Sequence, residues 1–182
     1  MKGIDFDWKV KRLELNTNIK PFESEDSDLN DFLTNDAKNY LAQMLAVTYL
    51  IETETETIAY FSLLNDNLKR SIQRDLSEEE SKIWNRLNRK VPNRKRKGTY
   101  PAVKIGRLAV SKKYAGSGFG KFIIQSVTSM YLDNEQKAGC RFITVDAYSS
   151  AYGFYEKNGF NFLTDKDIDK SERTMFYDLI AV

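Results

Sequence analysis

The order of strand, glycine turn and helix over residues 106–135 constrains the fold of this chain more than any other feature. The segment 106–110 leads into 115–121, where glycine occupies positions 116, 118 and 120, and a helical pattern follows. Glycine lets the backbone approach a ligand closely, and the first N–H groups of a helix attract an anion at the positive end of its dipole. The sequence therefore predicts a turn that binds a phosphate-bearing ligand; the alternative is a flexible turn without a ligand.

Two common nucleotide-binding patterns do not fit this turn. A dinucleotide fingerprint needs a third glycine where Lys121 or Ile123 stands, depending on which glycine begins it. The P-loop pattern needs a glycine at Ala115 and a serine or threonine at Phe122. The sequence thus disfavours both dinucleotide binding and nucleotide hydrolysis.

The chain has 182 residues and is 41% hydrophobic, which suffices for the core of one domain. We therefore expect a single domain over residues 1–182, with a helical and basic insertion at 65–99. The 28 basic and 26 acidic residues give no overall attraction to nucleic acid or membrane. An electrostatic partner must therefore bind a local patch.

Histidine is absent, and Cys140 is the only cysteine. These facts exclude histidine-dependent nucleophilic catalysis, an internal disulfide and the usual zinc sites, so we expect no metal site. Cys140 precedes an apolar strand, and we expect it to be buried in the core. No apolar run approaches the ~20 residues of a membrane span, and the first residues do not resemble a signal peptide. We expect a cytoplasmic protein with no membrane partner.

Hydrophobic periodicity predicts an α/β fold. The expected strands cover residues 8–15, 47–51, 58–64, 100–110, 142–147, 160–163 and 174–179, and the expected helices cover 27–44, 77–91, 122–131 and 151–158. The second and third strands should form an antiparallel hairpin, and Ser27 should cap the first helix. In the strand 100–110 the apolar residues change parity after Ile105, which predicts a bulge at residues 106–107.

Two motifs make the sequence similar to the GNAT superfamily of N-acetyltransferases. The segment 115–120 corresponds to the family's acetyl-CoA loop, Arg/Gln-x-x-Gly-x-Gly/Ala, and 151–160 corresponds to its Ala-x-x-Phe-Tyr-x-x-x-Gly-Phe signature. The resemblance implies a mixed, mostly antiparallel central sheet with helices on both faces and a bulged, splayed central strand. Phe22, the apolar residues of 29–33, the hairpin and 106–110 are further similar to the toxin-type branch, which acetylates aminoacyl-tRNA.

The resemblance also implies which residues bind acetyl-CoA. Backbone groups at the strand end would receive the pantetheine arm, the Leu108 N–H would polarise the thioester carbonyl, and N–H groups of the turn would hold the pyrophosphate. Ala115 replaces the family's Arg or Gln, and Tyr148 stands where Asn is common. Whether these changes weaken CoA binding stays open. The implied cofactor-binding residues are Leu108, Ala109, Val110, Ala115, Gly116, Ser117, Gly118, Phe119, Gly120, Lys121 and Tyr148.

Tyr155 matches the family tyrosine that protonates the departing CoA thiolate. A phenol with a pKa near ~10 is protonated at neutral pH and can donate a proton. The alternative is that Tyr155 only packs at the margin of the core with its hydroxyl in water, and Tyr148 and Tyr152 are alternative proton donors. Residues 100–110 contain no acidic side chain, so the sequence does not identify the general base, and ordered water or a backbone carbonyl would suffice.

Basic residues crowd the segment 89–97, which contains no acidic residue. A polyanion such as tRNA is one candidate partner, and a solvated loop is the alternative. The basic residues are Arg89, Lys90, Arg94, Lys95, Arg96 and Lys97.

The motifs together predict an acetyltransferase that moves an acetyl group from acetyl-CoA to a primary amine by direct attack, with Tyr155 as the acid. Two alternatives stay open: a toxin-type enzyme that acts on the aminoacyl amine of charged tRNA, and a catalytically silent acyl-CoA-binding or regulatory module. The acceptor amine and the oligomeric state, monomer or homodimer, also stay open.

Overall fold

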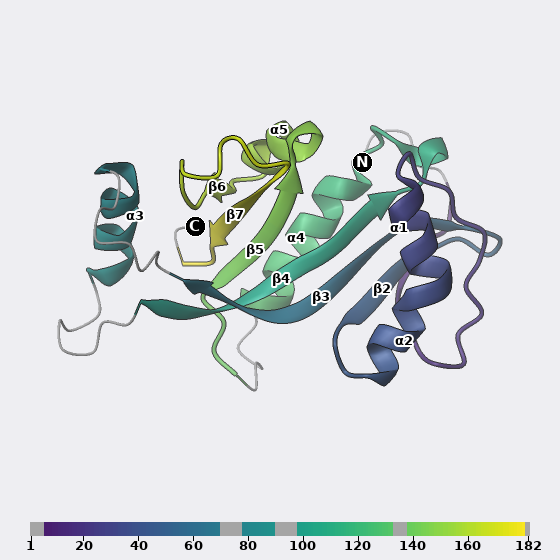
Figure 1. Cartoon of the computed structure of the whole chain (residues 1–182). Helices are drawn as coiled ribbons and strands as arrows, with labels where there is room; N and C mark the ends of the chain where they lie inside the picture. The colour runs from purple at the N-terminus through teal and green to yellow at the C-terminus, as the bar shows by residue number, and fades with distance from the viewer. Residues whose placement is uncertain (1–5, 70–77, 90–97, 133–137, 181–182) are drawn as a thin grey trace. The chain divides into compact units, whose positions relative to one another are not determined.

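The computed structural model describes residues 6–69, 78–89, 98–132 and 138–180, and Figure 1 shows its elements along the chain. Within these residues, seven strands are joined in the order β1-β2-β3-β4-β5-β7-β6. The pairs β1–β2, β2–β3, β5–β7 and β6–β7 are antiparallel, whereas β4 and β5 are parallel. The predicted mixed, mostly antiparallel sheet is therefore confirmed. The strands are β1 (Lys9–Arg12), β2 (Val47–Glu52), β3 (Thr57–Lys69), β4 (Thr99–Val110), β5 (Phe142–Tyr148), β6 (Asn161–Phe162) and β7 (Glu172–Asp178).

The described residues form two compact units. The first unit contains residues 6–65 and 105–132, and the second contains 66–69, 78–89, 98–104 and 138–180. The chain passes between the units within β3 and within β4. That residues 1–182 act as one domain stays a prediction. The bulge and the splay of β4 also stay predictions, because the described β4–β5 pairing joins only Ala102–Lys104 to Phe142–Thr144.

Short helices cover one face of the first unit. Helices α1 (Ser27–Asp31) and α2 (Ala37–Ala42) flank a π-helical turn, η1 (Phe32–Asp36). The N–H of Ala37 donates to the carbonyl of Phe32, five residues earlier, which places Ala37 above Phe32 in the core. An uninterrupted α-helix would have placed Asp36 there. The predicted helix over 27–44 is therefore present over residues 27–42, with a π-helical turn at its centre. The cluster under these helices contains Leu13, Phe32, Leu33, Ala37, Leu50, Tyr60 and Ala109.

The helix cap lies one residue before the predicted one. The Asp26 carboxylate accepts hydrogen bonds from the N–H groups of Asp28 (2.9 Å) and Leu29 (3.4 Å). The prediction of Ser27 is wrong because the Asp26 side chain takes the capping role one residue earlier, and its negative charge also suits the positive end of the helix dipole.

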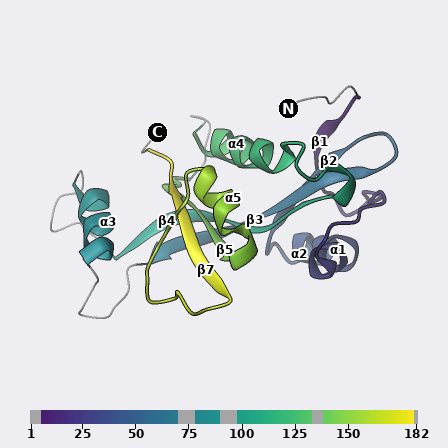
Figure 2. The same ribbon diagram turned by 90° about the horizontal axis from the view of Figure 1, so that it is seen from above.

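Helix α4 (Phe119–Leu132) covers the opposite face of the first unit, as the two views in Figures 1 and 2 show. It buries Phe119, Ile123, Ile124 and Val127. Of these, Ile123 and Val127 belong to the apolar spacing that predicted the helix. The Trp8 ring packs edge-on against Phe119, with centroids 5.5 Å apart. Helices on both faces are therefore confirmed for this unit.

The second unit is organised around β5 and β7, which pair over seven residues. The Arg141 guanidinium forks onto the Asp178 carboxylate with bonds of 2.7 and 2.9 Å and joins their ends. Helix α3 (Glu78–Asn88) contributes Trp84 to a buried aromatic cluster with Phe142 and Phe176. Helix α5 (Tyr152–Lys157) follows the 3-10 turn η4 (Ser149–Ala151). Thus the second predicted signature motif is helical, as expected.

Candidate functional site

The predicted pantetheine-binding residues end strand β4 in the first unit. Ala109 is buried in the core, whereas Leu108 and Val110 are half-buried. Beyond the strand, the Ser111 N–H donates to the carbonyl of Ile58 at 2.8 Å. The chain is therefore anchored on β3 just before it enters the glycine turn.

The backbone of the glycine turn explains two of its glycines. Gly116 and Gly118 have φ angles of 73° and 97°. This left-handed region is costly for any residue with a Cβ atom, and glycine adopts it freely. A short 3-10 turn, η3 (Lys112–Tyr114), precedes them, and helix α4 follows. The strand, turn and helix thus follow one another in the predicted order.

Some N–H groups of this turn are already engaged. Those of Ala115 and Ser117 each donate to a carbonyl of η3 at 3.2 Å. The first N–H groups of α4, by contrast, precede the helical ladder, which begins with the bond from the Phe122 N–H to the Gly118 carbonyl (3.0 Å). These N–H groups lie at the positive end of the helix dipole, so they are the backbone donors best suited to a phosphate. The exposed Lys121 lies in the same first turn.

Sequence reasoning missed the carboxylates that fasten η3. Glu56, in the turn between β2 and β3, accepts hydrogen bonds from Lys113 Nζ and from Tyr114 Oη (2.8 Å). The Lys113 ammonium and then the Tyr114 hydroxyl lower the pKa of Glu56. Glu23 pairs with Lys112 Nζ at 2.8 Å, which lowers the pKa of Glu23. Glu56 and Tyr114 are 58 residues apart, so no local pattern could have predicted this contact.

The proposed acid, Tyr155, lies on α5 in the second unit. It is 6% exposed, and its ring packs against Phe154 (5.0 Å) and Phe160 (5.2 Å). Burial raises the pKa of the Tyr155 phenol well above its ordinary value, so the hydroxyl is protonated at neutral pH. The side chain can therefore donate a proton, although its role stays a prediction.

The two alternative proton donors differ from Tyr155. Tyr148 ends β5 and is 50% exposed. Tyr152 packs edge-on against Phe162 at 5.1 Å, and its hydroxyl oxygen is buried without a hydrogen-bond partner among the described residues. Neither geometry excludes a role, and the cofactor contact predicted for Tyr148 stays a prediction.

A polar cavity of about 280 Å³ in the second unit contains carboxylates that sequence reasoning did not single out. Asp66 accepts a hydrogen bond from Thr144 Oγ1 (2.5 Å), and Asp146 accepts one from Thr174 Oγ1 (2.9 Å). Asp146 also pairs with the Lys104 ammonium. Because both carboxylates already accept hydrogen bonds or pair with a lysine, the cavity alone does not identify a general base.

The basic run lies almost entirely outside the described residues. Arg89 is described and exposed, whereas residues 90–97 are not described. The prediction that this run binds tRNA is therefore tested by nothing in the structure.

Other predictions concern the cysteine, metals and membranes. Cys140 is half-buried rather than buried, because its thiol lies at the edge of β5 and donates to the carbonyl of Phe142 at 3.3 Å. Burial raises the pKa of this thiol. Within the described part of the chain, no group of three or more acidic or thiol side chains is arranged to hold a metal ion. The helices seen in that part are also too short or too polar to cross a membrane.

Comparison with protein families gives a match to the acetyltransferase (GNAT) domain over residues 92–173. This range includes both the glycine turn and Tyr155. Comparison with curated proteins gives no match.

Solved structures with a similar fold include bacterial toxins. A tyrosine-to-phenylalanine mutant of KacT is similar with a TM-score of 0.74 and 19% identity, over 96% of each chain. AtaT complexed with acetyl-methionyl-tRNAfMet is similar with a TM-score of 0.74 and 20% identity, also over 96% of each chain. AtaTR bound with AcCoA is similar with a TM-score of 0.70 and 21% identity, over 96% of this chain and 95% of that chain. At these identities the likeness shows the fold.

Proposed function

We propose that this chain, which matches the acetyltransferase (GNAT) domain over residues 92–173, transfers an acetyl group from acetyl-CoA to a primary amine. One observation carries the proposal: the matched range contains both the glycine turn, with its left-handed backbone, and the buried, protonated Tyr155. The N–H groups at the start of α4 suit the pyrophosphate, as they would suit any phosphate.

The residues have distinct roles in the proposed reaction. The amine nitrogen attacks the thioester carbon, the carbon–sulfur bond breaks, and the CoA thiolate takes a proton from Tyr155 Oη. The attacking nitrogen loses its extra proton to water, and water returns a proton to Tyr155 Oη at the end of the cycle. The Leu108 N–H stabilises the negative charge that develops on the carbonyl oxygen, where a preorganised donor lowers the barrier.

A thermal-shift comparison of acetyl-CoA, NAD and ATP tests the cofactor. A ligand that binds only the folded state stabilises it by about 2.7 kcal/mol at a hundred times its Kd. We expect acetyl-CoA to raise the melting temperature and the other two to leave it unchanged. Stabilisation by NAD or ATP without acetyl-CoA would contradict the proposal.

The substitution Tyr155→Phe separates an enzyme from a silent acyl-CoA-binding module. Loss of the proton donor should lower turnover by about 10²–10⁴-fold, because this is the usual contribution of general acid catalysis. Acetyl-CoA affinity should stay within about twofold, since packing of the ring is kept. Tyr148→Phe and Tyr152→Phe test the two alternative proton donors, and each should retain wild-type turnover if Tyr155 is the acid. Calorimetry with acetyl-CoA and a thiol-release assay over a panel of amines give both quantities.

A second candidate function is acetylation of the aminoacyl amine of charged tRNA. It is supported by the fold likeness to AtaT in complex with acetyl-methionyl-tRNAfMet and by the basic run 89–97. Cell-free translation should stop when the protein and acetyl-CoA are added together and continue when either is omitted. Translation that continues with both present would count against this acceptor.

A further inference from the structure

We propose that Glu56 is a positioning residue for the pyrophosphate of acetyl-CoA. Glu56 accepts a hydrogen bond from Tyr114, and Tyr114 in turn contacts Ser117 in the glycine turn and Phe119 at the start of α4. This inference rests on the proposed function, because it assumes that the turn binds acetyl-CoA. All the residues involved belong to the first unit.

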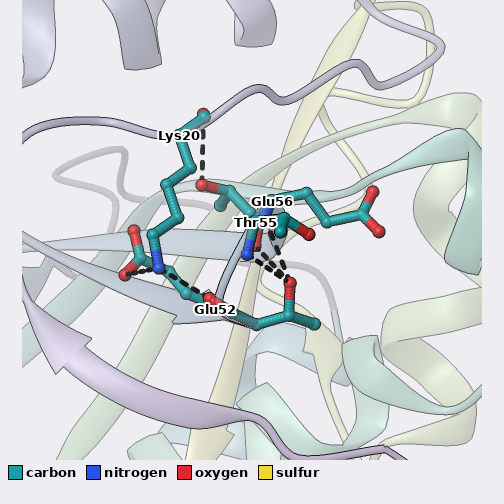
Figure 3. A network of polar contacts seen from close by, with 6 residues as sticks. Lys20, Glu52, Thr55 and Glu56 are labelled. Atoms are coloured by element: carbon teal, nitrogen blue, oxygen red, sulfur yellow. Dashed lines mark hydrogen bonds and ion pairs between the residues drawn. The ribbon is translucent and has the colours of Figure 1, made fainter.

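The turn that carries Glu56 is itself held by many bonds. Thr53 Oγ1 accepts hydrogen bonds from the N–H groups of Thr55 (3.2 Å) and Glu56 (3.1 Å), and the Thr53 N–H donates to the Glu56 carbonyl (3.0 Å). Figure 3 shows Thr55 and Glu56 within this network of polar contacts. Glu56 therefore extends from a rigid hairpin end rather than from a loose loop.

A lysine strengthens this hairpin end from outside the hairpin. Lys20 Nζ donates to the Thr53 carbonyl at 2.6 Å and lies 3.5 Å from the Glu52 carboxylate (Figure 3). Glu52 is 1% exposed, and its oxygens have no hydrogen-bond partner among the described residues. Lys20 therefore attaches the segment before α1 to the end of the hairpin, through its contacts with Thr53 and Glu52.

Tyr114 connects Glu56 to the glycine turn. Its carbonyl accepts hydrogen bonds from the N–H (3.2 Å) and the hydroxyl of Ser117, in the middle of the turn. Its ring packs edge-on against Phe119, the first residue of α4, with centroids 6.1 Å apart. Phe119 is fully buried, so the contact joins the start of the helix to Tyr114. The backbone of Tyr114 thus holds the middle of the turn, and its ring contacts the start of α4.

A preformed turn matters because ordering a flexible segment on binding costs conformational entropy. Gly116 and Gly118 give the turn more freedom than other residues would, so external fastening has a large effect there. With Glu56 removed, the N–H groups should no longer be aimed at one place, and the phosphates should bind more weakly.

Electrostatics alone predicts that removal of Glu56 strengthens acetyl-CoA binding. Glu56 neutralises Lys113, so its removal would free a positive charge two residues before the turn. A free ammonium attracts pyrophosphate and would raise the affinity for acetyl-CoA. The direction of the change therefore distinguishes positioning from simple charge.

The test compares two acyl donors in four variants by calorimetry at pH 7.5, where Glu56 is ionised. Acetyl-CoA carries the pyrophosphate, whereas acetyl-pantetheine lacks it. We expect Glu56→Ala and Tyr114→Phe to weaken acetyl-CoA binding about tenfold, the effect of losing one charge-assisted hydrogen bond. Glu56→Gln keeps an acceptor for Tyr114 and should lose less. Glu54→Ala, an exposed position in the same hairpin turn, is the matched control and should bind like wild type.

Each outcome is informative. Unchanged or tighter acetyl-CoA binding in Glu56→Ala would overturn the positioning role, as would an equal loss with acetyl-pantetheine, which indicates general damage to the fold. If Glu56→Ala does not fold, Tyr114→Phe decides by the same comparison, since it removes one hydroxyl only. Failure of the wild-type protein to bind acetyl-CoA would instead refute the proposed function.

Discussion

Two buried tyrosines limit the stability of this fold at alkaline pH. Tyr60 donates from its hydroxyl to the carbonyl of Leu29 at 2.7 Å, and Tyr155 is enclosed by aromatic rings. Burial raises the pKa of both phenols far above the ordinary value. The folded state therefore favours the neutral form of each side chain more strongly than the unfolded state does.

This difference predicts the alkaline stability. The stabilisation is fully present below the unfolded pKa of about 10 and is lost as the pH rises from there toward the folded pKa values. Each phenol should lower the free energy of unfolding by about 1.4 kcal/mol per pH unit in that window. Urea denaturation at pH 8, 10 and 11 measures the slope, and Tyr60→Phe should make it shallower. Equal slopes for wild type and variant would show that the phenol of Tyr60 ionises freely in the folded protein.

At the scale of elements, the end of α5 gives the second signature motif a physical meaning. The Phe160 N–H donates to the Tyr155 carbonyl (3.1 Å), and the Gly159 N–H donates to the Glu156 carbonyl (3.0 Å). Gly159 has a φ of 86°, so these bonds form a Schellman motif. The motif also brings the Phe160 ring against Tyr155, which makes the glycine part of the support of the proposed acid.

Alanine substitutions at the two glycines of this region should have opposite effects. Gly159→Ala forces a Cβ into the left-handed region and to 3.0 Å from Tyr177, so we expect a loss of about 1–2 kcal/mol in unfolding free energy. Gly153→Ala lies inside α5 with open space around its Cβ, so it should be neutral or stabilise by up to about 1 kcal/mol. Urea midpoints of the two variants decide. Equal midpoints would contradict the capping role.

Local patterns predicted most of these elements because they arise from local chemistry. The spacing of Ile123 and Val127 gave α4, and the β-branched runs gave the hairpin. The contact between Glu56 and Tyr114 could not be predicted, because it depends on how the hairpin and η3 meet after folding. The π-helical turn was also missed, since apolar spacing alone does not distinguish a wide turn from an α-helical one.

At the scale of the whole molecule, the chain carries one tryptophan in each compact unit. Trp8 packs against α4 in the first unit, and Trp84 is buried in the aromatic cluster of the second. Strands β3 and β4 each contribute residues to both units, so neither unit keeps all of its strand residues if the other unfolds. We therefore expect a single cooperative unfolding transition, as for one domain.

Single-tryptophan variants test this expectation. Trp84→Phe leaves fluorescence from the first unit, and Trp8→Phe leaves fluorescence from the second. The urea midpoint from fluorescence should agree with the midpoint from far-ultraviolet circular dichroism within each variant. A fluorescence midpoint that differs from the dichroism midpoint in either variant would indicate two domains that unfold separately.

The π-helical turn between α1 and α2 marks a place where related chains can lose one residue. Five residues occupy Phe32–Asp36 where an α-helix would need one fewer to bring Phe32 and Ala37 together. Removal of the exposed Thr34 would therefore close the turn into a regular helix and keep both core contacts. Deletions elsewhere in α1 or α2 would rotate apolar side chains out of the core. Related chains should thus tolerate a gap of one residue at this place, and an alignment that forbids it would misplace every position of α2.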